Sequence, residues 1–283
     1  QLMQVHRGLS AGMLSGDAAL AARRPVAREA LEKAMGDVAA SFAAAQVPMP
    51  QASAWAQAQQ TWKTLEQAVA ARSLQTAQST AQHTQLIASI MLINEGLLHA
   101  YGLQTDAAPD THALIQASLV HAPMLGEKLG VLRAQGSGFL GRGELPLQDK
   151  GQLLMLRQRV IELQAETLRS FDRAMDRNPQ FRQALGGKTQ ELQGMVTQSL
   201  QLLEGEVLNA TTLQLPAKDY FDHFTRTIEA LNALNAQAAG NLAQSLKDRV
   251  ADLQQSLLWV AVALLTTLSL SAALALVFVR SMT

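Results

Sequence analysis

The chain has 283 residues with 23 basic and 23 acidic side chains, and it contains no cysteine. This charge balance provides no dominant basic patch, so we expect no nucleic-acid partner. The lack of cysteine excludes disulfides and thiolate metal sites. An aromatic content of only 4%, beside abundant Ala, Gln and Leu, favours long helices over sheets.

The first part of the chain is predicted to hold two long helical stretches separated by a proline-rich stop. Residues 1–46 are expected to be helical with a break near Gly16 and Pro25. Pro48-Met49-Pro50 then ends this region. From 51 to about 104 the chain has no proline, so we expect a single helix of ~75–80 Å.

The middle of the chain is predicted to hold further long helices. One is interrupted at Pro123 and ends at Gly141 and Gly143. Pro146 starts the next long helix, whose pattern is interrupted at Asn178-Pro179 and at Gly186-Gly187 before it resumes to about Leu208. In the helix after Pro146, apolar residues recur every seven positions, a spacing typical of a coiled-coil seam, at Leu147, Leu154, Ile161, Leu168 and Met175.

The last helix is predicted to run without a break from Lys218 to Val279, with Gly240 as its one weak position. Its second part, 257–279, contains no charged residue and has Trp259 near its start. A helix of this length spans ~35 Å, which is enough to cross a hydrocarbon core of ~30 Å. Tryptophan suits the border of a bilayer. We therefore predict a transmembrane helix over 257–279.

No segment shows the alternation of a β-strand, so the predicted fold class is all-α. We expect long antiparallel helices in an elongated bundle or in two stacked four-helix bundles, followed by the C-terminal transmembrane helix. Because long amphipathic helices near a membrane need partners, we also expect a homodimer.

Two arginines share a local setting that suits an anion. Arg7 shares a predicted helix face with Ser10, and Arg133 shares one with Ser137, among glycines that let a ligand or a neighbouring helix come close. A partly buried guanidinium needs an anionic partner, and its planar fork matches a carboxylate, nitrate or a similar oxyanion. We therefore predict an anion site at these four residues.

The same arginines have a second interpretation that involves no ligand. Either guanidinium can form an internal ion pair, for instance with Glu95 or Glu127, between helices that pack closely through glycine. Other chemistry finds no support, because the histidines form no i, i+4 pair and the sequence has no phosphate loop or nucleophile elbow. We expect no metal, no cofactor and no enzymatic activity, and any catalytic output module would lie beyond Thr283.

Four short blocks carry a resemblance to known receptors. The stretch His6-Arg7-Gly8-Leu9-Ser10-Ala11-Gly12 resembles the Arg-Gly-Leu-Ser-Ala-Gly signature of nitrate- and nitrite-sensing (NIT-type) helical domains, whose commoner form has Glu before the arginine. The stretches Leu132–Gly138 and Phe221–Leu231 resemble later segments of such receptor regions. Val279-Arg280-Ser281-Met282-Thr283 resembles the junction at which bacterial receptors pass from their second membrane helix into a HAMP linker.

The resemblance implies the ligand-sensing region of a bacterial transmembrane receptor, most often a methyl-accepting chemoreceptor. Residues 1–256 would form a periplasmic sensor domain, 257–279 would cross the inner (cytoplasmic) membrane, and 280–283 would begin a truncated HAMP linker. The ligand would be nitrate, nitrite or a small carboxylate, and the response a small displacement of the last helix. Two alternatives stay open: a membrane-anchored helical scaffold without a small-molecule site, and an organic-acid sensor of a histidine kinase or diguanylate cyclase.

Overall fold

The computed structural model describes residues 1–282, and within them every regular element is a helix. The predicted all-α fold class is therefore confirmed. The chain divides into two compact units, the first Gln1–Ala238 and the second beginning at Ala239. Thr283, the last residue of the expected linker, lies outside the described residues.

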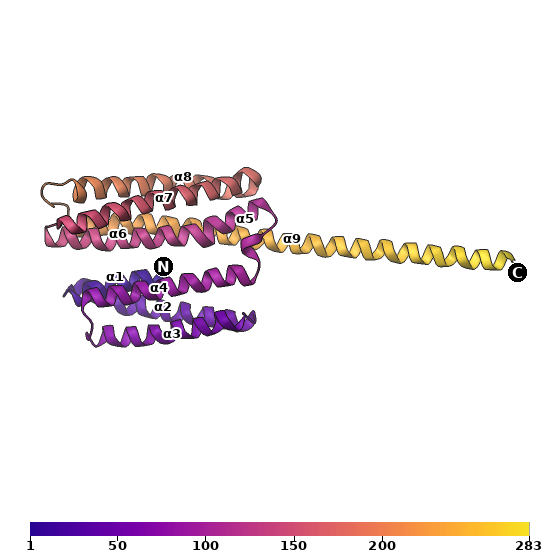
Figure 1. Cartoon of the computed structure of the whole chain (residues 1–283), viewed down its shortest axis with the longest axis horizontal. Helices are drawn as coiled ribbons and strands as arrows, with labels where there is room; N and C mark the ends of the chain where they lie inside the picture. Colours follow the sequence, from indigo (N-terminus) through magenta and orange to yellow (C-terminus); the bar gives the residue numbers. More distant parts are fainter. Residues whose placement is uncertain (283) are drawn as a thin grey trace. The chain divides into compact units, whose positions relative to one another are not determined.

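A four-helix bundle opens the first unit (Figure 1), formed by α1 (Leu2–Leu14), α2 (Ala18–Ala44), α3 (Met49–Ala70) and α4 (Thr76–Ala100). The predicted break at Gly16 is present, because this glycine takes a φ of +92° and lets the chain reverse. The Asp17 carboxylate then accepts hydrogen bonds from the backbone N–H groups of Ala19 and Leu20 and so caps α2. Pro25 causes no break and lies inside α2.

The single helix predicted from 51 to about 104 is wrong, because the chain turns back at Arg72 and forms the antiparallel pair α3 and α4. Arg72 takes a φ of +52°, and a capping box at Gln75 starts α4. No proline or glycine marks this turn in the sequence. Packing selects it, since the pair buries apolar side chains from both helices, Trp62 and Ile87 among them, in one core.

The rest of the first unit forms a second four-helix bundle, which begins after the short turn η1 (Leu103–Thr105). One of its rods combines α5 (Pro109–Ile115), the π-helical η2 (Gln116–His121) and α6 (Ala122–Arg142). The others are α7 (Leu147–Arg177), α8 (Pro179–Leu203) with its π-helical end η3 (Glu204–Leu208), and the start of α9 (Ala217–Met282). The Tyr220 hydroxyl of α9 donates to the Leu132 carbonyl of α6 at 3.1 Å. The sequence left open either one elongated bundle or two four-helix bundles, and this unit has two four-helix bundles.

Pro123 does not interrupt its rod as predicted. The rod instead widens into the π-helix η2 just before the proline, which has no N–H to donate to the Leu119 carbonyl. The side chain of Asn94 on α4 supplies the missing donor, with its Nδ2 2.8 Å from the Leu119 oxygen. The first bundle thereby satisfies a carbonyl of the second.

The seam predicted on α7 is wrong by one residue over most of its length, although its last member, Met175, is buried as predicted. Leu147 is 86% exposed and Leu154 47% exposed, whereas the line one residue earlier in each heptad is buried, at Leu153, Val160, Thr167 and Ala174. Apolar side chains occur on both lines, and packing of α7 against α6 and α8 selects the second. The interruption predicted at Gly186-Gly187 is also wrong. α8 continues through both glycines, at a cost of about 1 kcal/mol each that packing can offset.

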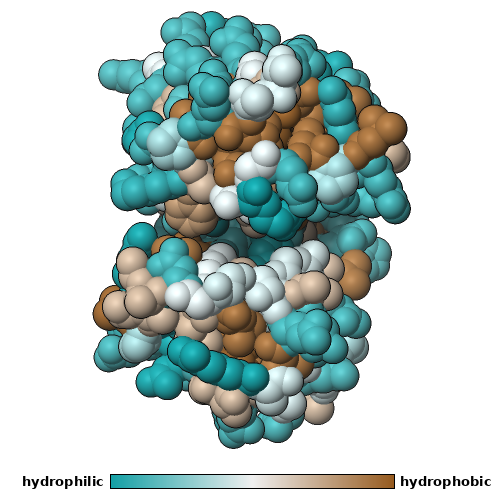
Figure 2. Space-filling view, turned by 90° about the vertical axis from the view of Figure 1, so that its left-hand side faces the viewer, coloured by the Kyte–Doolittle hydropathy of each residue, from teal (hydrophilic) through white to brown (hydrophobic). Residues whose placement is uncertain are grey.

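The two bundles meet where α1 lies against α6. Figure 2 shows the hydrophobic residues of this unit in two separate clusters, one in the upper and one in the lower half, with mainly polar residues between them. The contact between the bundles is itself partly polar. Polar side chains cross it, and they include Gln4, Arg7 and Glu127.

The second unit contains the remainder of α9, which ends at Met282. Among the described residues, α9 is the helix long and apolar enough to cross a membrane. The large apolar side chains of 257–279 are exposed, with Trp259 at 63%. The C-terminal apolar helix predicted from the sequence is therefore present.

Candidate anion-binding site

Arg7 lies where α1 meets α6 and pairs with a buried carboxylate. Its Nη1 lies 2.5 Å from Glu127 Oε1, and its Nη2 donates to Glu127 Oε2 at 3.2 Å. Gln4, one turn earlier on α1, donates to the same Oε2 at 2.8 Å. All three side chains are buried. The internal ion pair that the sequence offers as an alternative is therefore present, with Glu127 as the partner of Arg7.

Two further contacts hold the Arg7 guanidinium. Its Nη1 also donates to Thr84 Oγ1 on α4, at 2.8 Å. Its Nη2 lies over Gly130 of α6, where a Cβ atom would come within 3.3 Å of it. Gly130 thus makes room for the arginine, as expected from the small residues that surround both arginines in the sequence.

Arg133 is a buried cation on α6 and is only 5% exposed. Its Nη1 donates to Thr225 Oγ1 of α9 at 2.9 Å, and its guanidinium stacks on Phe221, 4.5 Å from the ring centroid. Its Nε is buried and has no hydrogen-bond partner among the described residues. None of the ion pairs between described residues includes Arg133. The side chain therefore lacks the carboxylate that Arg7 has.

The electrostatics around Arg133 favour an added negative charge. Burial first, and then the charge of Arg7, lower the pKa of Arg133 to about 10, although Glu229 and Glu127 act in the opposite direction. The guanidinium still carries its charge at neutral pH. A buried cation beside another cation costs free energy, which a bound anion would offset.

The two predicted serines are placed differently. Ser137 lies one turn after Arg133 on α6, partly buried, and its Oγ donates to the Arg133 carbonyl oxygen at 2.7 Å. Ser10 lies inside the first bundle, where its Oγ is 3.2 Å from His6 Nδ1 and accepts from Arg24 Nε at 3.3 Å. Arg133 and Ser137 therefore lie on α6, and Arg7 lies against this helix. Ser10 instead lies among His6 and Arg24 inside the first bundle.

Sequence reasoning missed the residues that distant helices contribute. Thr84 of α4 and Thr225 and Phe221 of α9 contact the two guanidinium groups. Phe221 and Thr225 stand four residues apart and so share a helix face, which is the one local signal that links them. Nothing in the sequence near Thr84 indicates that it meets Arg7, because that contact depends on how α1 and α4 pack.

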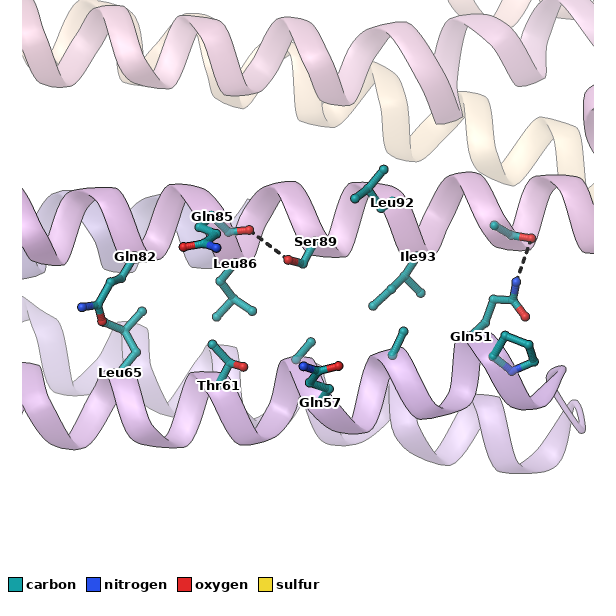
Figure 3. Close-up of a pocket in the computed structure, with 14 residues that line it drawn as sticks. Gln51, Gln57, Thr61, Leu65, Gln82, Gln85, Leu86, Ser89, Leu92 and Ile93 are labelled. Carbon is teal, nitrogen blue, oxygen red and sulfur yellow. Dashed lines mark hydrogen bonds between the residues drawn. The ribbon is translucent and has the colours of Figure 1, made fainter.

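A cavity of about 690 Å³ lies elsewhere, between α3 and α4 (Figure 3). Figure 3 shows Leu86 and Ile93 pointing from α4 toward α3, with the amide side chains of Gln57, Gln82 and Gln85 nearby. None of the residues that line this cavity is charged. It therefore offers no cation to an anionic ligand. Within the described residues, no group of three or more His, Asp or Glu side chains is arranged to hold a metal ion.

The comparison with protein families agrees with the resemblance seen in the first block of the sequence. The family model described as nitrate and nitrite sensing (NIT) matches residues 1–243, which include the whole first unit with Arg7 and Arg133. Comparisons with curated proteins and with solved structures find no match. Because the matched region covers most of the chain, the chain belongs to the nitrate- and nitrite-sensing (NIT) family of sensor domains.

Proposed function

We propose that this chain is the ligand-sensing region of a bacterial transmembrane receptor that binds a small anion between its two bundles, at Arg133 and beside Arg7. The observation that carries the proposal is the Nε of Arg133, a buried donor on a buried cation with no partner among the described residues. Nitrate and nitrite present oxygen acceptors in one plane, which matches the guanidinium fork. Membership of the NIT family supports the same class of ligand.

Each predicted site residue has a distinct part in this proposal. Arg133 donates to the anion through Nε, and Arg7 supplies a second positive charge while it stays paired with Glu127. Ser137 holds the Arg133 carbonyl and so supports the turn of α6 on which the arginine lies. Ser10 acts indirectly, through its contacts with His6 and Arg24 inside the first bundle.

The proposed signal leaves the site through α9. Thr225 and Phe221 hold Arg133 to this helix, so an anion that draws the guanidinium toward itself changes the contact with α9. A ligand that binds one arrangement of these helices better shifts the population toward it. We propose that the shift passes along α9 into the predicted span 257–279, toward a HAMP linker that begins at 280.

The remaining parts of the proposal follow from the second unit. Residues 1–256 would lie in the periplasm, the span would cross the inner membrane, and the output would be that of a methyl-accepting chemoreceptor. A homodimer would cover the exposed apolar side chains of α9 that follow one another in steps of three and four, namely Val250, Leu253 and Leu257.

A thermal-shift screen of the full chain in nanodiscs tests the proposed function, with nitrate, nitrite and small carboxylates as probes. Arg133→Ala removes the unpartnered donor, and Arg226→Ala, an exposed arginine on α9, is the matched control. Nitrate or nitrite at a hundredfold excess over its Kd is expected to stabilise the wild type and the control by about 2.7 kcal/mol, and to leave Arg133→Ala unchanged.

Two other results of this screen favour the alternatives. Stabilisation by small carboxylates and not by nitrate or nitrite would point to an organic-acid sensor. A folded helical protein that no anion stabilises would contradict the anion site and favour a scaffold.

A further inference from the structure

The helix α7 carries apolar residues on two faces. Its inner face packs against α6 and α8 and contains the buried line Leu153, Val160, Thr167 and Ala174. Its outer face carries most of the heptad series that stands out in the sequence. In that series Leu147 and Leu154 are exposed, and Ile161 and Leu168 are partly exposed. The bundle therefore does not use this part of the heptad pattern for its own core.

The residues between these large side chains extend the pattern. Each of the first three is followed four positions later by a small or uncharged residue, and all three of those residues are exposed, namely Gly151, Gln158 and Ala165. The seven positions follow one another in steps of four and three, which is the spacing of a coiled-coil contact. We call them the outer stripe: Leu147, Gly151, Leu154, Gln158, Ile161, Ala165 and Leu168. The stripe is ~32 Å long.

Exposed apolar side chains are concentrated at this helix. The first unit has eight exposed large hydrophobic side chains, and three of them lie within nine residues of α7, at Leu147, Leu154 and Met155. The other five are scattered over the unit, at Val26, Met49, Leu92, Tyr101 and Met124. Among the described residues of α8, the neighbouring surface helix, no large hydrophobic side chain is exposed. A row of exposed apolar side chains on one helix face is typical of a contact surface.

The shape of the outer stripe suits a second copy of itself. Leucine and isoleucine alternate along it with glycine, glutamine and alanine. In a coiled coil each large side chain inserts between residues of the facing helix, and small residues let the two helices approach closely. The stripe provides both the large side chains and the space between them. Two identical stripes can therefore interlock.

The polar residue within the stripe also suits a second copy in the same direction. A carboxamide both donates and accepts, so Gln158 can form a hydrogen bond with its own counterpart. Its Nε2 already donates to Glu162 Oε1 at 3.2 Å, which leaves a second N–H and the amide oxygen for the other copy. Such a pair forms where the two helices run parallel and in register.

The charges beside the stripe agree with a parallel pair. In that arrangement a residue on one edge of the stripe faces the residue five positions later on the other copy. Arg157 would face Glu162, Gln164 would face Arg169, and Lys150 would face Met155. No two like charges meet at these positions. Asp172, the next residue of the series, would face its own counterpart, and so the contact ends at Leu168.

We propose that the outer stripe of α7 joins two copies of this chain as a parallel pair of helices in register. This contact lies in the first unit and adds to the one proposed above for Val250, Leu253 and Leu257 of α9. It uses neither Arg7 nor Arg133, so it does not depend on the anion site.

Cysteine cross-linking of the full chain in membrane vesicles tests the proposal. The chain has no cysteine, so each introduced thiol can react only with its counterpart in another copy. A disulfide requires Cα atoms within about 7 Å of each other. Under mild oxidation, Leu154→Cys and Ala165→Cys are expected to form covalent dimers with a yield several-fold above that of Gln152→Cys. Gln152 is the matched control because it is exposed on the same helix but lies outside the stripe.

A charge within the stripe gives a second measurement. Addition of Ala165→Glu to Leu154→Cys is expected to lower the yield several-fold, because two carboxylates would then face each other. Addition of Gln152→Glu, the matched control, is expected to leave the yield unchanged. Both substitutions affect exposed positions, and circular dichroism checks that the helices are retained.

Three results would overturn the proposal. One is an equal yield from Leu154→Cys, Ala165→Cys and Gln152→Cys. Another is a yield from Ile161→Cys alone, near the middle of the stripe, which would indicate antiparallel helices. The third is cross-linking of Val250→Cys with none in the stripe, which would restrict the dimer to α9 and leave the proposed function intact. The response to nitrate in the thermal-shift screen tests the proposed function separately.

Discussion

The Nη2 of Arg7 lies over the backbone of Gly130, so close that a Cβ atom on this glycine would come within 3.3 Å of it. Gly130 stands three residues before Arg133 on α6, and the two positions share a helix face. The glycine therefore allows one arginine to approach the other. This approach creates the region of positive charge to which we assign the anion.

Replacement of Gly130 by alanine is expected to weaken nitrate binding by about tenfold, because the added Cβ displaces Arg7 and lengthens a charged hydrogen bond. The Kd from isothermal titration measures the effect. Gly187→Ala on α8 is the matched control, since a Cβ there has nothing within 4 Å and brings the same gain in helix propensity. Equal affinities in the two variants would contradict the role given to Gly130.

Gly136→Ala is expected to destabilise the second bundle by about 1–3 kcal/mol, a decrease in Tm of about 3–10 °C. A Cβ at this position would overlap the ring and hydroxyl of Tyr220, a fully buried side chain whose hydroxyl donates to the Leu132 carbonyl. Thermal unfolding followed by circular dichroism measures the change. Gly141→Ala on the same helix meets nothing within 4 Å and should unfold no earlier than the wild type.

Asn94→Ala is expected to cost about 1 kcal/mol, because it leaves the Leu119 carbonyl without the donor that Pro123 cannot supply. In a Pro123→Ala background the helix regains a backbone N–H, so the same substitution should cost less. A double-mutant cycle from thermal unfolding gives this coupling. An equal cost of Asn94→Ala in both backgrounds would show that Pro123 is not the reason for this hydrogen bond.

His83 makes stability depend on pH. Its pKa in the folded protein is lowered by burial from 6.5 to about 4, so between these values the unfolded chain binds more protons than the folded one. The stability that His83 contributes is fully present above pH 6.5 and is lost as the pH falls toward 4. Between pH 7 and 5 the loss is about 2 kcal/mol. Unfolding experiments at these pH values should show a smaller acid loss in His83→Gln than in the wild type. The same loss in both would place the titration elsewhere.

Helix ends that carry their own signal could be predicted from the sequence. Gly16 reverses the chain and Gly143 ends α6 with a φ of +72°, because glycine tolerates this conformation. The turn at Arg72 has no such signal and exists because two apolar helix faces cover each other. The phase of α7 was ambiguous for a similar reason, since two lines of apolar residues compete and only the neighbouring helices select between them.

Some residues of the candidate site also carry a local sequence signal, whereas others depend on how the helices pack. Arg7 and Arg133 stand out because small residues surround them, and Glu127 was one of two carboxylates that the sequence offered as a partner. Thr225 of α9 comes from a helix more than ninety residues away along the chain, as the separation of 92 from Arg133 shows. A partner at that distance is set by bundle packing, which local patterns do not encode.

A crystal structure of the sensor grown with nitrate tests the central claim most directly. The account predicts a nitrate between the two bundles, with an oxygen within about 3.2 Å of Arg133 Nε and with Arg7 as the second neighbouring cation. A nitrate bound elsewhere, with the Nε of Arg133 still unpartnered at saturating ligand, would contradict it.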